Sequence, residues 1–147
     1  MIQIINKSKD LTTNQIEKII NILPCEYQNL NIELIFPKSK FQCLSYIHLK
    51  NYYENIIGIF TGWIRGSSCE YYNKCFVYTF NFDLTGEYRG IQKLYIIHTI
   101  YHEIRHQWQR LYCICNNKEI DANNFADDIM NIKYDEITKI LKNFKEE

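Results

Sequence analysis

The sequence lacks an excess of charge of either sign. Its 147 residues include 17 Lys or Arg and 17 Asp or Glu, so the formal net charge is zero. Proteins that attract nucleic acid or anionic membranes over long range usually carry a basic excess, and this composition has none. We therefore expect no direct nucleic-acid partner.

Long apolar runs are missing as well. No stretch approaches the roughly 20 apolar residues that span a bilayer. Residues 1–5 lack the charged start and long apolar stretch of a signal peptide. We expect a cytoplasmic protein without a membrane partner. With 46% hydrophobic residues, a chain of this length can bury one sizeable core, so residues 1–147 are predicted to form a single domain.

The cysteines lack the spacing of a disulfide framework or of a C-x-x-C zinc site. They are Cys25, Cys43, Cys69, Cys75, Cys113 and Cys115. Free thiols are the expected state. One alternative stays open, because Cys113 and Cys115 lie two residues apart near a histidine-rich segment and could supply a thiolate to a metal.

Hydrophobic periodicity predicts an α+β fold. An amphipathic helix is expected over residues 10–23, where Thr12 and Thr13 are candidate caps and Pro24 marks the end. Strands are expected at residues 30–36, 43–48, 56–64 and 75–83. Helices are expected at residues 91–111, at residues 118–130 and after Met130. The sequence thus predicts an N-terminal helix, a small and mostly antiparallel sheet, and C-terminal helices that carry the site.

The most informative motif is His102-Glu103-Ile104-Arg105-His106. It lies within the predicted helix 91–111, where residues four apart share one face. His102 and His106 can therefore direct ring nitrogens at one ion, about 2 Å from each. Glu103 can reach a water on that ion and accept its proton. The H-E-x-x-H pattern is a known metalloprotease signature.

A catalytic zinc usually has three protein ligands and one position for water. The next predicted helix offers two candidates for the third ligand, Glu119 and Asp121. Glu119 shares a helix face with the small residues Ala122 and Ala126, which would allow close packing against the His helix. Helical geometry therefore favours Glu119, with Asp121 as the alternative. Asn123, one turn on from Glu119, can hydrogen-bond to a ligand.

These residues together resemble the ImmA/IrrE family of zinc metallopeptidases, which bacteria and their mobile elements encode. That family has an H-E-x-x-H helix followed by a helix that reads E-x-x-A-N/D-x-F-A, and this chain has Glu119, Ala122, Asn123, Phe125 and Ala126 at those positions. The resemblance covers about the C-terminal third of the chain. It implies zinc held by His102, His106 and Glu119, Glu103 as the base, and a minimal zincin-like fold.

Two departures from the family pattern matter. Family members commonly have a small residue before the second His, where this chain has Arg105, which suggests a divergent branch from a phage or mobile element. Members also often accompany a helix-turn-helix repressor that they cleave, and no such segment is visible in this chain. The resemblance implies that the protein cleaves a peptide bond in a repressor or in a host regulatory protein.

Peptide hydrolysis also needs a donor for the developing oxyanion. The candidates are Tyr88 and Arg105, together with Arg89 and Tyr101, and the sequence does not choose among them. His98 extends the series of His102 and His106, but a helix separates His98 from His106 by about 12 Å along its axis, too far for one ion. His98 is expected to pack or to hydrogen-bond instead.

The strand at residues 75–83 immediately precedes the His helix. By analogy with other zinc peptidases, a strand beside the metal pairs with an extended substrate, which makes this strand the candidate for that role. A plain core strand is the alternative.

Two other functions remain open. The first is a phage- or plasmid-encoded inhibitor, a binding protein built on a metallopeptidase scaffold. The intact Glu103 argues against it, because a structural zinc site needs ligands but no base. The second is zinc-dependent hydrolysis of a bond other than a peptide bond, which the ligands alone allow.

Overall fold

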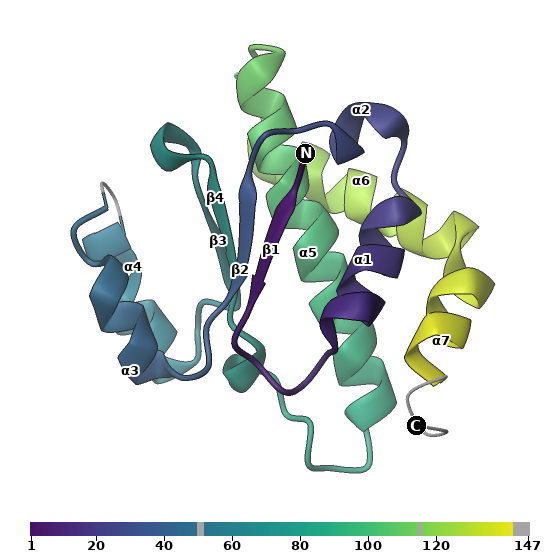
Figure 1. Ribbon diagram of the computed structural model, residues 1–147, viewed down its shortest axis with the longest axis horizontal. Coiled ribbons are helices and arrows are strands. Elements are labelled where there is room, and N and C mark those ends of the chain that lie inside the picture. Colours follow the sequence, from purple (N-terminus) through teal and green to yellow (C-terminus); the bar gives the residue numbers. More distant parts are fainter. Residues whose placement is uncertain (50–51, 115, 143–147) are drawn as a thin grey trace.

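The computed structural model describes residues 1–49, 52–114 and 116–142 (Figure 1). The thiolate role considered for Cys115 and the end of the closing helix, residues 143–147, lie outside this part of the chain. The strands are β1 (Gln3–Asn6), β2 (Glu33–Phe36), β3 (Gly66–Cys69) and β4 (Lys74–Val77). The α-helices are α1 (Thr13–Asn21), α2 (Cys25–Gln28), α3 (Lys40–Cys43), α4 (Tyr52–Thr61), α5 (Arg89–Leu111), α6 (Lys118–Ile132) and α7 (Tyr134–Lys142).

The strands form one mixed sheet in the order β1-β2-β4-β3. β1 and β2 are parallel, β2 and β4 are parallel, and only β3 runs antiparallel, against β4. The α+β class is confirmed, but the expected mostly antiparallel sheet is wrong. The helices between β1 and β2 return the chain to the same end of the sheet, so β2 is parallel to β1. After β2, α3 and α4 lead into β3, which runs back along the sheet, and β4 then runs parallel to β2.

Helices cover both faces of this sheet. α1, α5, α6 and α7 lie on one side, and α3 and α4 lie on the other (Figure 1). In β2, Leu34 and Phe36 belong to the core under α5, whereas Ile35 belongs to the core under α3 and α4. Strands buried on both faces are apolar at successive positions. This burial explains why residues 34–36 read as a continuous apolar run.

Two of the predicted strands are helical. Residues 43–48 begin at the end of α3 and continue into a 3₁₀ turn, Leu44–Tyr46, and residues 56–64 belong mainly to α4. α4 buries Tyr52 and Ile59, two turns apart, so its apolar residues follow a helical period that a short window does not separate from a buried strand. The helix ends before Gly62, whose φ of 83° suits glycine.

The other expected strands are partly confirmed. The strand at 30–36 is shorter and is β2, and the strand at 75–83 ends at Val77, before a 3₁₀ turn at Thr79–Asn81. β1 and β3 were not predicted. Each has four residues, and β3 reads Gly-Ser-Ser-Cys, which contains none of the β-branched aliphatic or aromatic residues that mark strands.

The structure contains the helices that the sequence predicts for α1, α5 and α6. α1 begins after the cap residue Thr12, whose hydroxyl accepts a hydrogen bond from the backbone N–H of Gln15 at 3.1 Å. α5 spans the whole predicted segment and buries Ile97, Ile100 and Ile104 completely. α6 begins at Lys118, as expected. Among the described residues, none of the helices has both the length and the apolar character needed to cross a membrane.

Candidate metal centre

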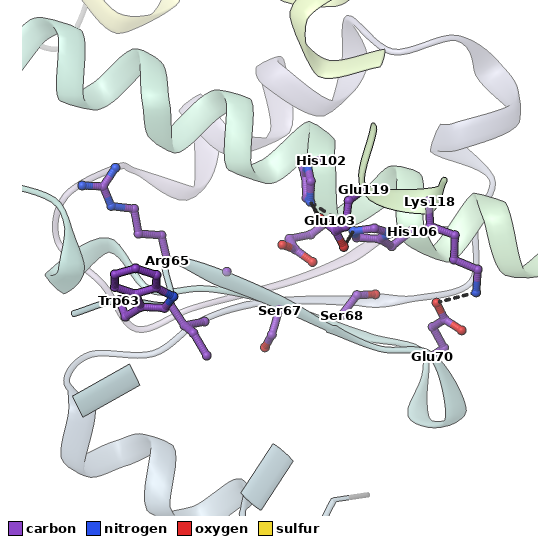
Figure 2. A pocket seen from close by; sticks show the side chains of 12 residues that line it. Trp63, Arg65, Ser67, Ser68, Glu70, His102, Glu103, His106, Lys118 and Glu119 are labelled. Atoms are coloured by element: carbon purple, nitrogen blue, oxygen red, sulfur yellow. Dashed lines mark hydrogen bonds and ion pairs between the residues drawn. The ribbon is translucent and has the colours of Figure 1, made fainter. Parts of the chain in front are cut away.

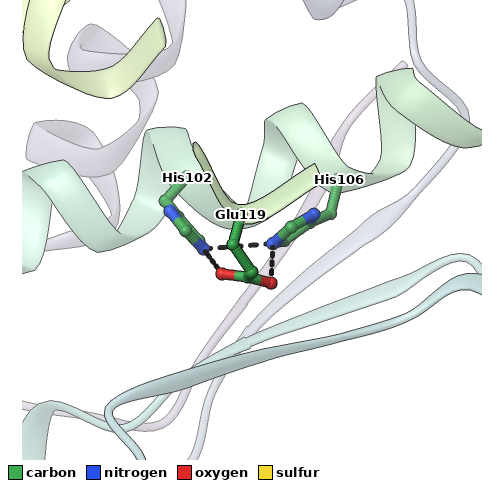
Figure 3. Close-up of side chains that lie close together, drawn as sticks. All are labelled: His102, His106 and Glu119. Carbon is green, nitrogen blue, oxygen red and sulfur yellow. Dashed lines mark hydrogen bonds and ion pairs between the residues drawn. The ribbon is translucent and has the colours of Figure 1, made fainter. Parts of the chain in front are cut away.

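One face of α5 brings the two histidines of the motif together. The Nε2 atoms of His102 and His106 lie 3.0 Å apart. The carboxylate of Glu119, on the first turn of α6, lies between them (Figure 3). Its oxygens are 3.1 Å from His102 Nε2 and 3.0 Å from His106 Nε2. These three side chains form a group that could hold a metal ion.

The structure separates the two candidates for the third ligand. Glu119 reaches both histidines, whereas Asp121 forms hydrogen bonds of 2.8 and 3.0 Å with Arg105. The reason is the face that each residue takes on α6. Ala122 and Ala126 are completely buried, and their small side chains let the face that also carries Glu119 pack closely against α5.

The donor atoms of the three side chains lie close enough together to share one metal ion. The ligand atoms of a tetrahedral zinc with bonds of about 2.0–2.1 Å lie roughly 3.3 Å apart. The two Nε2 atoms lie 3.0 Å apart, and each of them is 3.0 or 3.1 Å from a different oxygen of Glu119. Two imidazoles and a carboxylate are also a common donor set for catalytic zinc. The Glu119 side chain is 74% exposed, so solvent reaches this position. Of the described residues, Cys113 is not part of the group.

Both histidines also have hydrogen-bond partners outside the group. His106 Nδ1 is 2.8 Å from Gln109 Oε1, and the side chain of Asn123 hydrogen-bonds to His102. Burial is the main effect that lowers the pKa of His102, and the neighbouring His106 adds to it, against Glu119 and Asn123. His102 is therefore held in the neutral form that binds metals. His98 is 2.9 Å from Asp127 and outside the group, as expected.

Glu103 lies buried beside the candidate metal site. Removal from water raises the pKa of its carboxyl group to about 8, and the negative charge of Glu119 contributes to the shift. A cation held by Glu119 and the histidines would oppose this shift. Gly66 of β3 lies against the same side chain, since a Cβ atom at Gly66 would stand 3.1 Å from Glu103 Oε1.

An open pocket of about 420 Å³ lies between α5, the start of α6 and strand β3. His102, Glu103, His106 and Glu119 line one side, and β3 runs along the other (Figure 2). The wall also includes residues that sequence reasoning missed: Trp63, Arg65, Ser67, Ser68, Glu70 and Lys118. Trp63, Arg65 and Ser67 adjoin Gly62 or Gly66, and Lys118 directly precedes Glu119. β3 has no strand pattern in its sequence that could have indicated the others.

The suggested oxyanion donors do not line this pocket. Tyr88 precedes the first turn of α5, about 20 Å along the helix from His102 by helical rise. Arg105 points the other way and contacts Asp121, Tyr27 and the ring of Trp108. Of the remaining candidates, Tyr101 is buried and donates to Ile19 O at 2.8 Å, and Arg89 begins α5. The structure therefore corrects the suggestion for Tyr88 and Arg105.

The strand beside the pocket is also different from the one expected. β4, which overlaps the predicted strand 75–83, pairs with β2 on one edge and β3 on the other, so it is a core strand that has no edge for a substrate. β3 is the edge strand on the pocket side of the sheet, and its outer edge has no strand partner within the described residues. An added strand at this pocket would therefore pair with β3.

Comparison with known proteins finds no matching family model, no similar curated protein and no similar solved structure. The resemblance to the ImmA/IrrE family therefore rests on the motif residues alone. Together with the zincin-like description of the fold, it stays a prediction.

Proposed function

We propose that this protein is a zinc-dependent peptidase with zinc held by His102, His106 and Glu119. One observation carries the proposal: three metal-binding side chains from two helices converge at an open pocket, with the buried carboxylate of Glu103 beside them. A structural metal site requires no such carboxylate and is usually closed by a fourth protein ligand. Membership in the ImmA/IrrE family is part of this proposal.

Each residue of the site has a separate chemical role. Zinc, when bound, supplies a Lewis acid that polarises a carbonyl group and lowers the pKa of a coordinated water toward 7. Glu103 accepts the proton of the attacking water and later delivers it to the leaving amine. Asn123 and Gln109 hydrogen-bond to His102 and His106, respectively, and so orient the two rings.

Strand β3 supplies a place for an extended peptide. Tyr78 N–H donates to Arg65 O at 2.9 Å, and Ser67 pairs with Phe76 in the antiparallel register. Antiparallel bonds alternate along a strand, so the backbone amides of Gly66 and Ser68 point to the free edge. A substrate strand added there would lie beside the candidate zinc site. A repressor or another regulatory protein of a bacterial host is the target class that we propose.

The first test measures the metal content of the protein. The protein is expressed in zinc-rich medium, purified and analysed by mass spectrometry. We expect about one zinc per chain, lost in His102→Ala and in Glu119→Ala. Asp128→Ala is the matched control, because Asp128 is an exposed acidic residue of α6 that is not part of the metal-binding group. We expect this variant to bind zinc as the parent does. A parent protein without metal would refute the proposal.

The second test separates an enzyme from a binding protein. Glu103→Gln keeps the shape of the side chain and removes the base, so cleavage of a mixed peptide library should fall about 10²- to 10⁴-fold with zinc still bound. If Glu103→Gln retained the biological effect of the parent, the scaffold would act by binding, as an inhibitor does.

A further inference from the structure

Gln109 lies at the last full turn of α5 and is completely buried. Its side chain has three partners. Oε1 is 2.8 Å from His106 Nδ1, and Nε2 is 2.9 Å from Lys118 O and 2.7 Å from Asp121 Oδ2. One amide thus contacts a candidate metal ligand on α5 and, on the first turn of α6, both Lys118, which precedes Glu119, and Asp121, two residues after it.

The partners of the amide determine its orientation. The carbonyl oxygen of Lys118 and the carboxylate of Asp121 can only accept hydrogen bonds, so they face the NH₂ group of Gln109. The carbonyl oxygen Oε1 must then face His106, and it can only accept. His106 therefore carries its proton on Nδ1 and leaves the lone pair of Nε2 directed at Glu119 and the candidate metal position.

The same amide holds the start of α6. The segment that joins α5 to α6 ends in Asn116 and Asn117, and the cap position Asn117 has a positive φ of 53° and no side-chain cap. Gln109 supplies a donor to the Lys118 carbonyl, and Arg105 holds the other side of Asp121 through two hydrogen bonds. Both contacts place the first turn of α6, and with it Glu119, against His106.

We propose that Gln109 is a positioning residue that assembles the metal site from its two helices. It selects the His106 tautomer that can bind a metal and, through the same side chain, holds the helix turn that carries Glu119. This inference rests on the proposed metal site. It assigns to Asp121 a supporting role, as a partner of Gln109 and Arg105.

The test compares two buried glutamines on the same helix. Gln107 is 1% exposed and donates to Ser68 Oγ at 2.7 Å and to Lys74 O at 3.3 Å, both on the sheet. Gln109→Leu and Gln107→Leu therefore remove similar buried amides. Zinc affinity is measured by competition with a chromogenic chelator, and folding is checked by circular dichroism.

We expect Gln109→Leu to weaken zinc binding about 10- to 100-fold, the usual cost of removing a partner of a metal ligand. Gln107→Leu should bind zinc as the parent does. Equal losses in both variants, or no loss in Gln109→Leu, would overturn the inference while the zinc site itself stood. A parent that binds no zinc would overturn the proposed function and this inference together.

A second measurement does not need the metal. Nitrogen-15 chemical shifts report which ring nitrogen of His106 carries the proton in the metal-free protein at neutral pH. We expect Nδ1–H in the parent and a loss of this preference in Gln109→Leu. Gln109→Glu keeps the acceptor for His106 but repels Asp121, so it should keep the tautomer and lose zinc affinity. An Nε2–H tautomer in the parent would overturn the inference.

Discussion

Gly66 leaves space that no other residue could leave at its position. A Cβ atom there would stand 2.6 Å from the Thr99 methyl group and 3.1 Å from Glu103 Cγ. Threonine is branched at Cβ and adjusts poorly, so a side chain at position 66 would push β3 away from α5 or displace Glu103. The absence of a side chain here is what allows the edge strand to lie against the candidate base.

We predict that Gly66→Ala lowers stability by about 1 to 3 kcal/mol, the usual cost of inserting a methyl group into a packed site. Library cleavage should fall as Glu103 moves. Gly90→Ala is the control, because nothing lies within 4 Å of its Cβ position and the residue lies in α5, where alanine favours the helix. Thermal unfolding of both variants measures the difference. Equal stabilities would contradict the predicted clash.

The pair of Arg105 and Asp121 makes stability depend on pH. Hydrogen bonds from Arg105 are the main cause that lowers the pKa of Asp121 below 3.8, against some desolvation, and Gln109 adds to the effect. Because the folded pKa is lowered, the stabilisation is complete above the unfolded pKa and is lost as pH falls through the folded value.

We therefore predict that the parent is more stable than Asp121→Asn at pH 7 and that the difference shrinks below about pH 4. Unfolding by urea at a series of pH values measures it. A difference that stayed constant down to pH 2 would show that the charge of Asp121 does not contribute.

The edge strand β3 permits a test of substrate pairing. Ser68→Pro removes the outward amide hydrogen, which edge strands tolerate, and Ser68→Ala removes only the hydroxyl that Gln107 contacts. If peptides add to this edge, kcat/KM for library peptides should fall about tenfold or more in Ser68→Pro relative to Ser68→Ala. Equal values in the two folded variants would exclude pairing at Ser68.

The closing helix α7 contributes to stability through one buried side chain. Ile137 is fully buried in the core that also contains residues of α1 and α5. We predict that Ile137→Ala costs about 2 to 5 kcal/mol, from the lost transfer free energy and the cavity. Ile132→Ala serves for comparison, since Ile132 is 75% exposed and should change stability by less than about 0.5 kcal/mol. Chemical denaturation gives both values.

For the whole molecule, zinc and folding should be coupled. The metal group combines residues of α5 and α6, so it exists only when these helices are packed together. A ligand that binds the folded state alone, at 100 times its Kd, adds about 2.7 kcal/mol. This corresponds to roughly 5 to 10 °C in Tm for a chain of this size.

We predict that chelation of the metal lowers Tm by this order and that Glu119→Ala shows no response to added zinc. Calorimetry with and without chelator measures the shift. If the Tm of the parent changed with neither zinc nor chelator, the coupling between zinc binding and folding would be contradicted.

Local geometry explains what the sequence predicted correctly. His102 and His106 share a helix face because they are four residues apart, and the Glu119 face of α6 follows from the small residues Ala122 and Ala126. Gln109 stands three residues after His106 and so had a signal of the same kind. Tyr88 and Arg105 were misplaced, because proximity in sequence does not show which side of a long helix faces the pocket.

By itself, the sequence determined the α+β class, the helices that carry the motif and the spacing of the metal-binding group. Each of these depends on residues within a few turns of one another. Only the tertiary structure decided that β1, β2 and β4 are parallel, that β3 is the free edge beside the pocket, and that Asp121 pairs with Arg105. Strand order and facing helices depend on which distant segments bury one another's apolar faces, and that choice involves contacts across the whole chain.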